Sequence, residues 1–188
     1  MTAYQPDLFA AQLLPGLTFA EGFVSSAEEA DLIARLETTE LVPFRFQGWE
    51  GKRLTASFGY SYDFERGRVG PAPPVPAWLD PLRARAAALA GLEPGALRQA
   101  LLIRYGPGAA IGWHRDRPQF GTVVGVSLGD PAVLRLRRRS AGSFQRHALP
   151  LPPRSAYVLE GEARHEWEHS IVPQVGLRYS ITFRSLVG

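Results

Sequence analysis

Two early segments of the chain have apolar residues at helical spacing. In the first, from about 27 to 37, apolar residues recur every three or four positions, and Ser26 and Glu29 have the spacing of a capping box. The second, from about 77 to 90, is rich in alanine and arginine and is followed by Gly91, a common residue just past a helix C-terminus. Both segments are predicted to form helices.

From residue 99 onward, the helical pattern gives way to short runs of β-branched and aromatic residues, separated by Gly, Pro and Ser turns. These runs are predicted to be strands: Ala100–Tyr105, Thr122–Leu128, Val133–Arg137, Ala156–Leu159 and Tyr179–Phe183. Two helices ahead of roughly seven or eight strands indicate an α+β domain whose sheet is a sandwich or jelly roll.

Composition narrows the class of protein. The 188 residues, 45% of them hydrophobic, are enough for one domain with a single substantial core. No run of 18 apolar residues occurs, and the N-terminus lacks the basic and apolar regions of a secretory signal. We therefore expect a soluble, cytoplasmic, monomeric protein with no membrane partner.

The chain has no cysteine, which excludes disulfide frameworks, thiolate zinc sites and cysteine nucleophiles. Any metal must be held by His, Asp or Glu. Among the four histidines, His114 lies two residues before Asp116, and on a strand this spacing directs both side chains to one face. With His169 from a later strand, they would form the two-histidine, one-carboxylate triad of non-heme Fe(II) oxygenases. The alternative for such a short pair is an exposed, salt-bridged histidine.

Two arginines follow His169 at a spacing that suits an anionic ligand. Arg178 and Arg184 have the same parity on a predicted strand, so both guanidinium groups face one side. Arginine binds a carboxylate through two parallel hydrogen bonds, and a small dicarboxylate could lie between the two side chains. The alternative is a terminal strand that carries two solvated arginines.

These motifs together resemble the AlkB-like family of Fe(II)- and 2-oxoglutarate-dependent dioxygenases. The resemblance extends from about Leu101 to the C-terminus, and the first hundred residues match loosely. It includes the His114-x-Asp116 pair, His169, Arg104–Ala109, Val126–Gly129 and Arg178–Arg184. It implies a double-stranded β-helix, or jelly roll, with two or more N-terminal helices packed outside. Residues 1–99 would form an N-terminal extension and substrate lid, and residues 100–188 the catalytic core.

The resemblance also implies roles for individual residues. His114, Asp116 and His169 would hold Fe(II). Tyr105 and Arg178 would bind the distal carboxylate of 2-oxoglutarate, with Arg184 near its keto-acid end and Ser180 and Thr182 as minor contacts. The reaction would consume 2-oxoglutarate and O2, yield succinate and carbon dioxide, and release formaldehyde from a hydroxylated N-methyl group.

Two departures from the family pattern concern the cosubstrate and the substrate. Well-known nucleic-acid demethylases of the family carry an asparagine two residues before the cosubstrate tyrosine, and this chain has Ile103 there. Some place an acidic residue two positions after the metal-binding aspartate, and this chain has Pro118. Both changes are compatible with use of 2-oxoglutarate. The identity of the target base, however, cannot be carried over from the family pattern.

Substrate recognition is expected from aromatic residues in the first half. Residues 58–64 alternate aromatic with small or polar side chains, so one face of a strand there would be aromatic and could stack an extruded base. The alternative is an aromatic face packed on the core. Tyr60 and Tyr62 are the first candidates, and Trp113 and Arg115, beside the metal motif, could contact substrate or merely pack.

A basic cluster indicates the partner. A predicted hairpin carries five arginines that lie close together in the sequence: Arg135, Arg137, Arg138, Arg139 and Arg146. This pattern is compatible with binding to a nucleic-acid backbone or with a solvated face.

The leading hypothesis is therefore oxidative demethylation of N-alkylated bases in DNA or RNA. The spacing from Pro150 to His169 favours an alternative, a hydroxylase or demethylase of a tRNA base or a protein side chain. A binding module without turnover and a zinc hydrolase are further alternatives.

Overall fold

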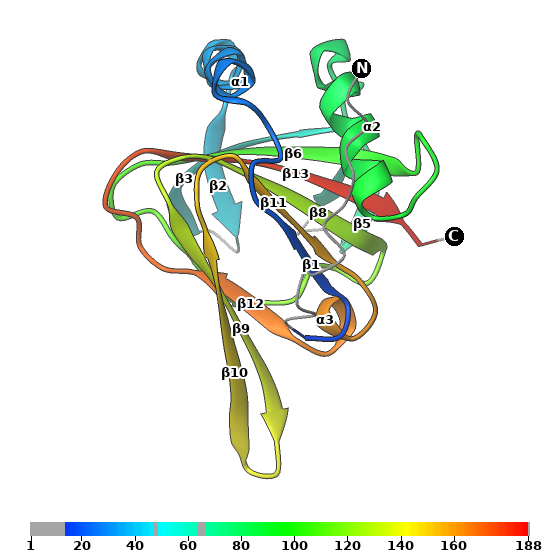
Figure 1. The fold of residues 1–188 in the computed structure, drawn as a ribbon, viewed down its shortest axis with the longest axis vertical. Helices are drawn as coiled ribbons and strands as arrows, with labels where there is room; N and C mark the ends of the chain where they lie inside the picture. Colours follow the sequence, from blue (N-terminus) through cyan, green and yellow to red (C-terminus); the bar gives the residue numbers. More distant parts are fainter. Residues whose placement is uncertain (1–13, 47–48, 64–66, 188) are drawn as a thin grey trace.

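Strands make up most of the structure, a computed structural model that describes residues 14–46, 49–63 and 67–187. Two main sheets lie face to face in a jelly-roll arrangement (Figure 1). The N-terminal segment used to judge the absence of a signal sequence lies outside the described residues. No helix in the described part of the chain is long and apolar enough to cross a membrane.

The sheets bring distant parts of the chain together. The larger sheet has seven strands in the order β1 (Leu17–Ala20), β11 (Ser155–Leu159), β8 (Phe120–Gly129), β13 (Arg178–Leu186), β6 (Leu97–Tyr105), β3 (Trp49–Phe58) and β2 (Val42–Phe46). The smaller sheet has four, in the order β10 (Ser143–Leu151), β9 (Ala132–Ser140), β12 (Glu168–Ile171) and β7 (Ile111–His114). A separate pair consists of β4 (Tyr60–Asp63) and β5 (Arg68–Pro71).

Each of the five predicted strands falls within an observed strand, in β6, β8, β9, β11 and β13. The chain also forms strands that the sequence pattern did not indicate, because β1, β2 and most of β3 lie in the half expected to be mainly helical. The protein is consequently richer in strand than predicted.

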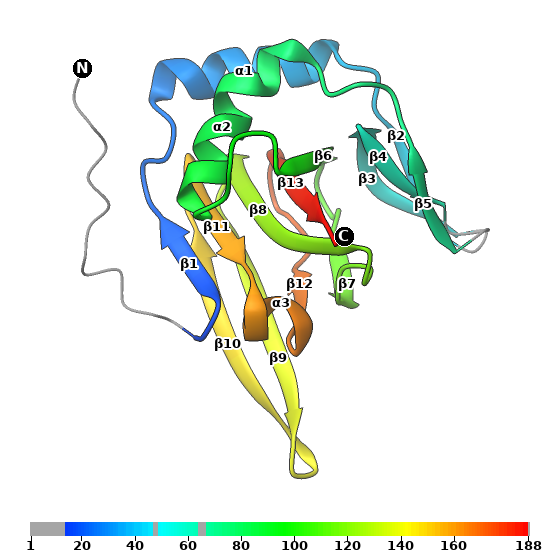
Figure 2. The same cartoon turned by 90° about the vertical axis from the view of Figure 1, so that its right-hand side faces the viewer.

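The helices are α1 (Ser26–Thr38), the 3₁₀ turn η1 (Ala77–Leu79), α2 (Asp80–Leu89) and α3 (Gly161–His165). The first and second predicted helices are confirmed, and Gly91 has the positive φ of +64° that suits a residue past a helix end. Figure 2 shows α1 and α2 beside the larger sheet and the long β9–β10 hairpin projecting from the other end.

The predicted capping box at the start of α1 is wrong. The N-cap is Ser25, whose side chain accepts a hydrogen bond from the backbone N–H three residues later at 3.2 Å. Ser26 accepts instead from Arg154 at 3.1 Å, and Glu29 accepts from the backbone N–H of Gly129 at 3.0 Å. Both residues of the predicted box therefore tie the helix to the sheet.

Two hydrophobic clusters support the sheets. One joins the larger sheet to α1 and α2, and its buried members include Leu32, Leu36, Leu82, Leu102, Val126 and Phe183. The other lies between the two sheets and includes Val123, Leu134, Leu136, Leu149, Leu159 and Trp167. Several residues of the second cluster also line a cavity between the two sheets.

Candidate active site

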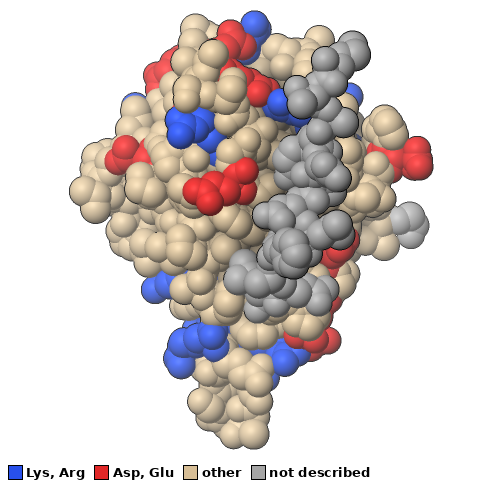
Figure 3. Space-filling model, in the orientation of Figure 1, with Lys and Arg blue, Asp and Glu red and all other residues tan. Residues whose placement is uncertain are grey.

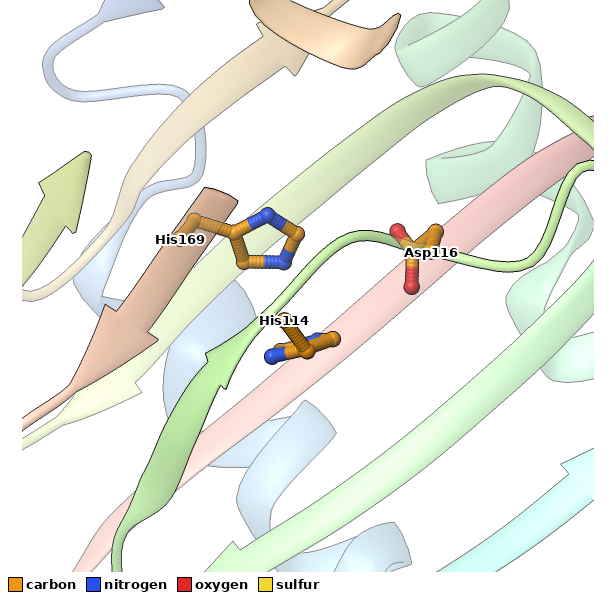
Figure 4. Close-up of side chains that lie close together, drawn as sticks. All are labelled: His114, Asp116 and His169. Atoms are coloured by element: carbon orange, nitrogen blue, oxygen red, sulfur yellow. The ribbon is translucent and has the colours of Figure 1, made fainter. Parts of the chain in front are cut away.

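Two histidines meet on adjacent strands of the smaller sheet. His114 ends β7 and lies directly opposite His169 of β12, with the ring centroids 4.3 Å apart. Asp116 follows β7, and one ligand atom from each of the three residues lies within 4.8 Å of the others. The two imidazoles and the carboxylate point toward one another (Figure 4). The structure thus brings together the three side chains that the sequence motifs singled out.

The charges of this cluster suit a cation. Burial lowers the pKa of His114, and burial together with the neighbouring His114 lowers the pKa of His169 to about 3, so both imidazoles are neutral at pH 7. Burial alone would raise the pKa of Asp116, but the positive charge of the adjacent Arg184, above all, holds it well below its usual range. Two neutral nitrogen donors therefore accompany one carboxylate anion.

Neighbouring polar groups orient these side chains. The Nδ1 atom of His114 lies 2.9 Å from the carbonyl oxygen of Gly112, which leaves Nε2 free to act as a ligand. Arg184 donates to Oδ1 of Asp116 at 3.0 Å and to the side chain of Gln99 at 2.9 Å. Gln99 and Arg184 thereby hold the carboxylate in place.

One atom in the cluster lacks a partner. The second oxygen of Asp116, Oδ2, is buried and makes no hydrogen bond within the described structure. A buried carboxylate oxygen without a partner is costly unless a cation or donor binds it. Two imidazole nitrogens and this oxygen match the ligand set of a non-heme iron centre with open positions, so the residues present fit Fe(II).

A second group of side chains lies on the inner face of the larger sheet. Arg178 of β13 is 1% exposed, pairs in register with Tyr105 of β6, and donates from Nε to the hydroxyl of Ser127 at 3.2 Å. Its Nη1 atom is buried without a hydrogen-bond partner in the described structure. A buried guanidinium nitrogen of this kind fits the carboxylate of a dicarboxylic acid such as 2-oxoglutarate.

A cavity of about 1020 Å³ joins the two groups. Both sheets line it, and its walls include these predicted site residues: His114, Asp116, His169, Tyr105, Arg178, Ser180, Thr182, Arg184, Tyr62, Trp113 and Arg115. Of the predicted set, Tyr60 alone does not line this cavity, and its hydroxyl lies 3.4 Å from Arg98 as a hydrogen-bond acceptor.

The aromatic face predicted over residues 58–64 is interrupted. Gly59 has a φ of +74°, and its missing side chain allows close approach to the carbonyl of Arg98, so β3 ends at Phe58 and β4 begins at Tyr60. Phe58 packs against the main hydrophobic cluster, as the alternative interpretation held. Tyr62 faces the cavity, and Phe64 lies outside the described residues.

Several residues near the site carried no motif in the sequence. Gln99 and Tyr157 line the cavity from strands that are otherwise largely apolar, and Ser127 supports Arg178. Arg164, 4% exposed, lies outside the cavity lining and supports the loop after Asp116. A polar residue in an apolar strand is a usable signal, but by itself it does not reveal the contact that it makes.

The basic cluster divides into paired and unpaired charges. Arg137 pairs with Glu168 at 2.7 Å, and Arg138 pairs with two glutamates of the α3 region at 2.9 Å. Arg139 and Arg146 are exposed, flank the ring of Phe144 at 5.4 and 5.7 Å, and form no ion pair with the described residues. Basic side chains lie on both sides of the narrow projection in Figure 3.

Comparison with known proteins gives concordant results. The model of the 2OG-Fe(II) oxygenase superfamily matches residues 16–184. The chain is 30% identical to the tRNA (carboxymethyluridine(34)-5-O)-methyltransferase ALKBH8 of Mus musculus, over 86% of this chain and 25% of that protein. It is 26% identical to the Alkylated DNA repair protein ALKBH8 homolog of Arabidopsis thaliana, over 84% of this chain and 51% of the other.

The chain therefore spans from a quarter to about half of the length of these two relatives. Among solved structures, that of OsALKBH1 superposes with a TM-score of 0.74 at 16% identity, covering 92% of this chain and 97% of the other. This structural likeness concerns the fold.

Proposed function

Because the chain belongs to the 2OG-Fe(II) oxygenase superfamily and is AlkB-like, we propose that it oxidatively demethylates N-alkylated bases in DNA or RNA. The family uses Fe(II), 2-oxoglutarate and O2. One observation carries the proposal: a His-Asp-His cluster with a partnerless carboxylate oxygen shares one cavity with a buried arginine that has a free N–H group.

Each part of the site has a role in this proposal. His114, Asp116 and His169 would hold the iron, which would supply the oxidative chemistry. Tyr105 and Arg178 bind the distal carboxylate of 2-oxoglutarate. The remaining inward-facing residues of β13 have lesser roles: Arg184 orients Asp116 beside the keto-acid end, and Ser180 and Thr182 provide minor contacts.

The substrate side of the cavity is lined by Tyr62, Trp113 and Arg115. The guanidinium of Arg137 lies 4.4 Å from the ring centroid of Trp113, and Arg115 donates a 3.1 Å hydrogen bond to the carbonyl of His165. We assign these three residues to contact with the target base. Tyr60 stays a weaker candidate because it lies outside the cavity.

Incubation of the Fe(II)-loaded protein with methylated DNA, RNA and peptides tests the function. Succinate formation coupled to mass loss from an oligonucleotide supports the proposal, and coupled modification of a peptide contradicts it. Turnover without O2 would indicate a hydrolase, and absence of succinate with every substrate would indicate a binding module.

The first prediction concerns the cosubstrate. Arg178→Lys is expected to weaken 2-oxoglutarate binding about 10-fold or more, because an ammonium lacks the planar fork that binds a carboxylate through two hydrogen bonds. Succinate formation measured against 2-oxoglutarate concentration gives the apparent affinity. Arg104→Lys, on the same sheet but paired with Glu37 at 3.4 Å, is the matched control. Equal affinity in Arg178→Lys and parent protein would remove Arg178 from the cosubstrate site.

The unpaired hairpin arginines support a polyanionic partner. The arginines at 137, 138 and 139 were all candidates for contact with a nucleic-acid backbone, but glutamates already balance the charges of Arg137 and Arg138. Arg139 and Arg146 keep their charges available on the exposed part of the hairpin. We therefore assign the main phosphate contacts to this second pair.

The second prediction follows from that assignment. Replacing Arg139 and Arg146 with alanine is expected to weaken oligonucleotide binding equally for all sequences and to flatten the slope of log affinity against log salt by about 2. Fluorescence anisotropy over a range of salt concentrations measures both effects. Arg138→Ala is the control and should change the slope little. A parent protein without salt-dependent affinity for oligonucleotides would favour a protein substrate instead.

A tRNA base is the second candidate substrate, favoured by the similarity to the mouse tRNA (carboxymethyluridine(34)-5-O)-methyltransferase ALKBH8. The same substrate panel separates it from DNA if methylated tRNA is included. We also propose that residues 1–188 act as one domain, a cytoplasmic monomer. In it, residues 1–99 form the extension and lid, α1 and α2 pack outside the double-stranded β-helix, and residues 100–188 form the catalytic core.

A further inference from the structure

Tyr157 extends across the floor of the cavity. It belongs to β11, where it lies directly opposite Gly125 of β8, and Gly125 in turn lies opposite Thr182 of β13. Side chains at such opposed positions leave the sheet on the same face. Thr182 lines the cavity, so Tyr157 and the missing side chain of Gly125 face the cavity as well.

The glycine makes room for the tyrosine ring. A Cβ atom at position 125 would lie 2.3 Å from Cζ and 2.5 Å from the hydroxyl oxygen of Tyr157. The end of the ring therefore overlies Gly125, one strand away from its own backbone. Neighbouring strands lie about 4.8 Å apart, so the hydroxyl has crossed one strand spacing toward β13, which carries Arg178.

The hydroxyl of Tyr157 has no hydrogen-bond partner in the part of the chain that the structure describes. Tyr157 is 7% exposed, yet no hydrogen bond of its hydroxyl exists among the described residues. Burial raises the pKa of Tyr157 to about 12, so the group is a neutral O–H donor at pH 7. Arg178 reaches toward the same strand, because its Nε donates to the hydroxyl of Ser127, two residues from Gly125 on β8 and on the same face.

We propose that Tyr157 belongs to the 2-oxoglutarate site and that its hydroxyl donates a hydrogen bond to the distal carboxylate held by Arg178. This inference rests on the proposed cosubstrate site. It accounts for Ile103, which lies in register with Ser180 on the same floor and cannot donate the hydrogen bond that an asparagine supplies in well-known family members. In this chain the hydroxyl of Tyr157 supplies the hydrogen bond instead, from β11 on the side of β13 away from β6.

The test is direct binding of 2-oxoglutarate to the Mn(II)-loaded protein without O2, measured by calorimetry. Tyr157→Phe removes the hydroxyl and keeps the ring, and it is expected to weaken binding about 10-fold or more, since a hydrogen bond to a charged group is lost. Tyr179→Phe is the matched control. The hydroxyl of Tyr179 is also buried without a partner in the described structure. Tyr179 is next to Arg178 in the chain but faces the hydrophobic cluster on the other side of the sheet, so Tyr179→Phe should leave the 2-oxoglutarate affinity unchanged.

Two further measurements separate binding from packing. Mn(II) affinity should be the same in Tyr157→Phe and parent protein, and the loss caused by Tyr157→Phe should shrink in an Arg178→Lys background, because both residues hold one carboxylate. Three results would each overturn the assignment of Tyr157. They are an unchanged 2-oxoglutarate affinity in Tyr157→Phe, a loss of Mn(II) affinity as large as the loss of 2-oxoglutarate affinity, and strictly additive effects of Tyr157→Phe and Arg178→Lys on 2-oxoglutarate binding. A parent protein that does not bind 2-oxoglutarate would instead refute the proposed cosubstrate site itself.

Discussion

Replacing His169 with alanine is expected to abolish iron-dependent turnover while the protein stays folded. The imidazole is one of three side chains whose ligand atoms lie within 4.8 Å of one another, and two remaining ligands hold Fe(II) poorly. Loss of groups that merely support metal ligands already costs 10- to 100-fold, so loss of a ligand should reduce turnover by at least about 100-fold. His114→Ala and Asp116→Ala should behave in the same way.

Succinate formation and bound iron, measured on the same sample, check this result, and circular dichroism verifies the fold. His165→Ala is the control, because the side chain of His165 is exposed. The hydrogen bond from Arg115 goes to its backbone carbonyl, which the substitution keeps. Turnover that persists in any of the three ligand variants would exclude that residue from the metal centre.

The largest effect on stability is expected at Arg164, a buried arginine of α3. Its guanidinium donates to the backbone carbonyls of Gly121, Arg117 and Phe120, at 2.9, 2.8 and 2.5 Å. Arg164→Met would leave these acceptors without their donor, so we expect a loss of about 3–5 kcal/mol in the free energy of unfolding. Chemical denaturation measures this difference.

A surface arginine provides the comparison. Arg83→Ala removes an exposed pair with Asp80 at 2.7 Å and should cost about 0.5 kcal/mol or less. The carbonyls held by Arg164 belong to the loop after Asp116 and to the start of β8, so Arg164→Met should also weaken Mn(II) binding. A stability loss no larger than that of Arg83→Ala would show that water or other donors replace the guanidinium.

Those parts of the site that have short, strict spacing were predictable from the sequence. Arg178 and Arg184 share β13, so the strand period determines the face on which that pair lies. The strand argument for His114 and Asp116 was wrong, because β7 ends at His114 and Asp116 lies beyond it, although their short separation does keep them close. The pairing of His169 with His114 is not local: a later strand could be expected to carry His169, and the family resemblance assigned it to the metal. The five predicted strands were recognisable because each contains a short run rich in β-branched or aromatic residues.

Other features depend on contacts between distant residues. Ser26 and Glu29 have the spacing of a capping box, but Ser26 binds Arg154, in the turn before β11, and Glu29 binds Gly129 at the end of β8. Gly59 breaks the aromatic strand because the backbone of Arg98 approaches it closely. In each case a tertiary contact overrides a local preference, and no window of sequence contains both partners.

The cavity replaces part of the core between the two sheets. His114 and His169 come from the smaller sheet, whereas Arg178 and Arg184 come from the larger one, and the ion pair of Arg184 with Asp116 crosses between them. An iron ion and a cosubstrate bound in the cavity would contact both sheets. Because they bind the folded protein and not the unfolded chain, their binding raises the free energy of unfolding. A shortage of cosubstrate would therefore leave the enzyme easier to unfold and to degrade, as well as slower.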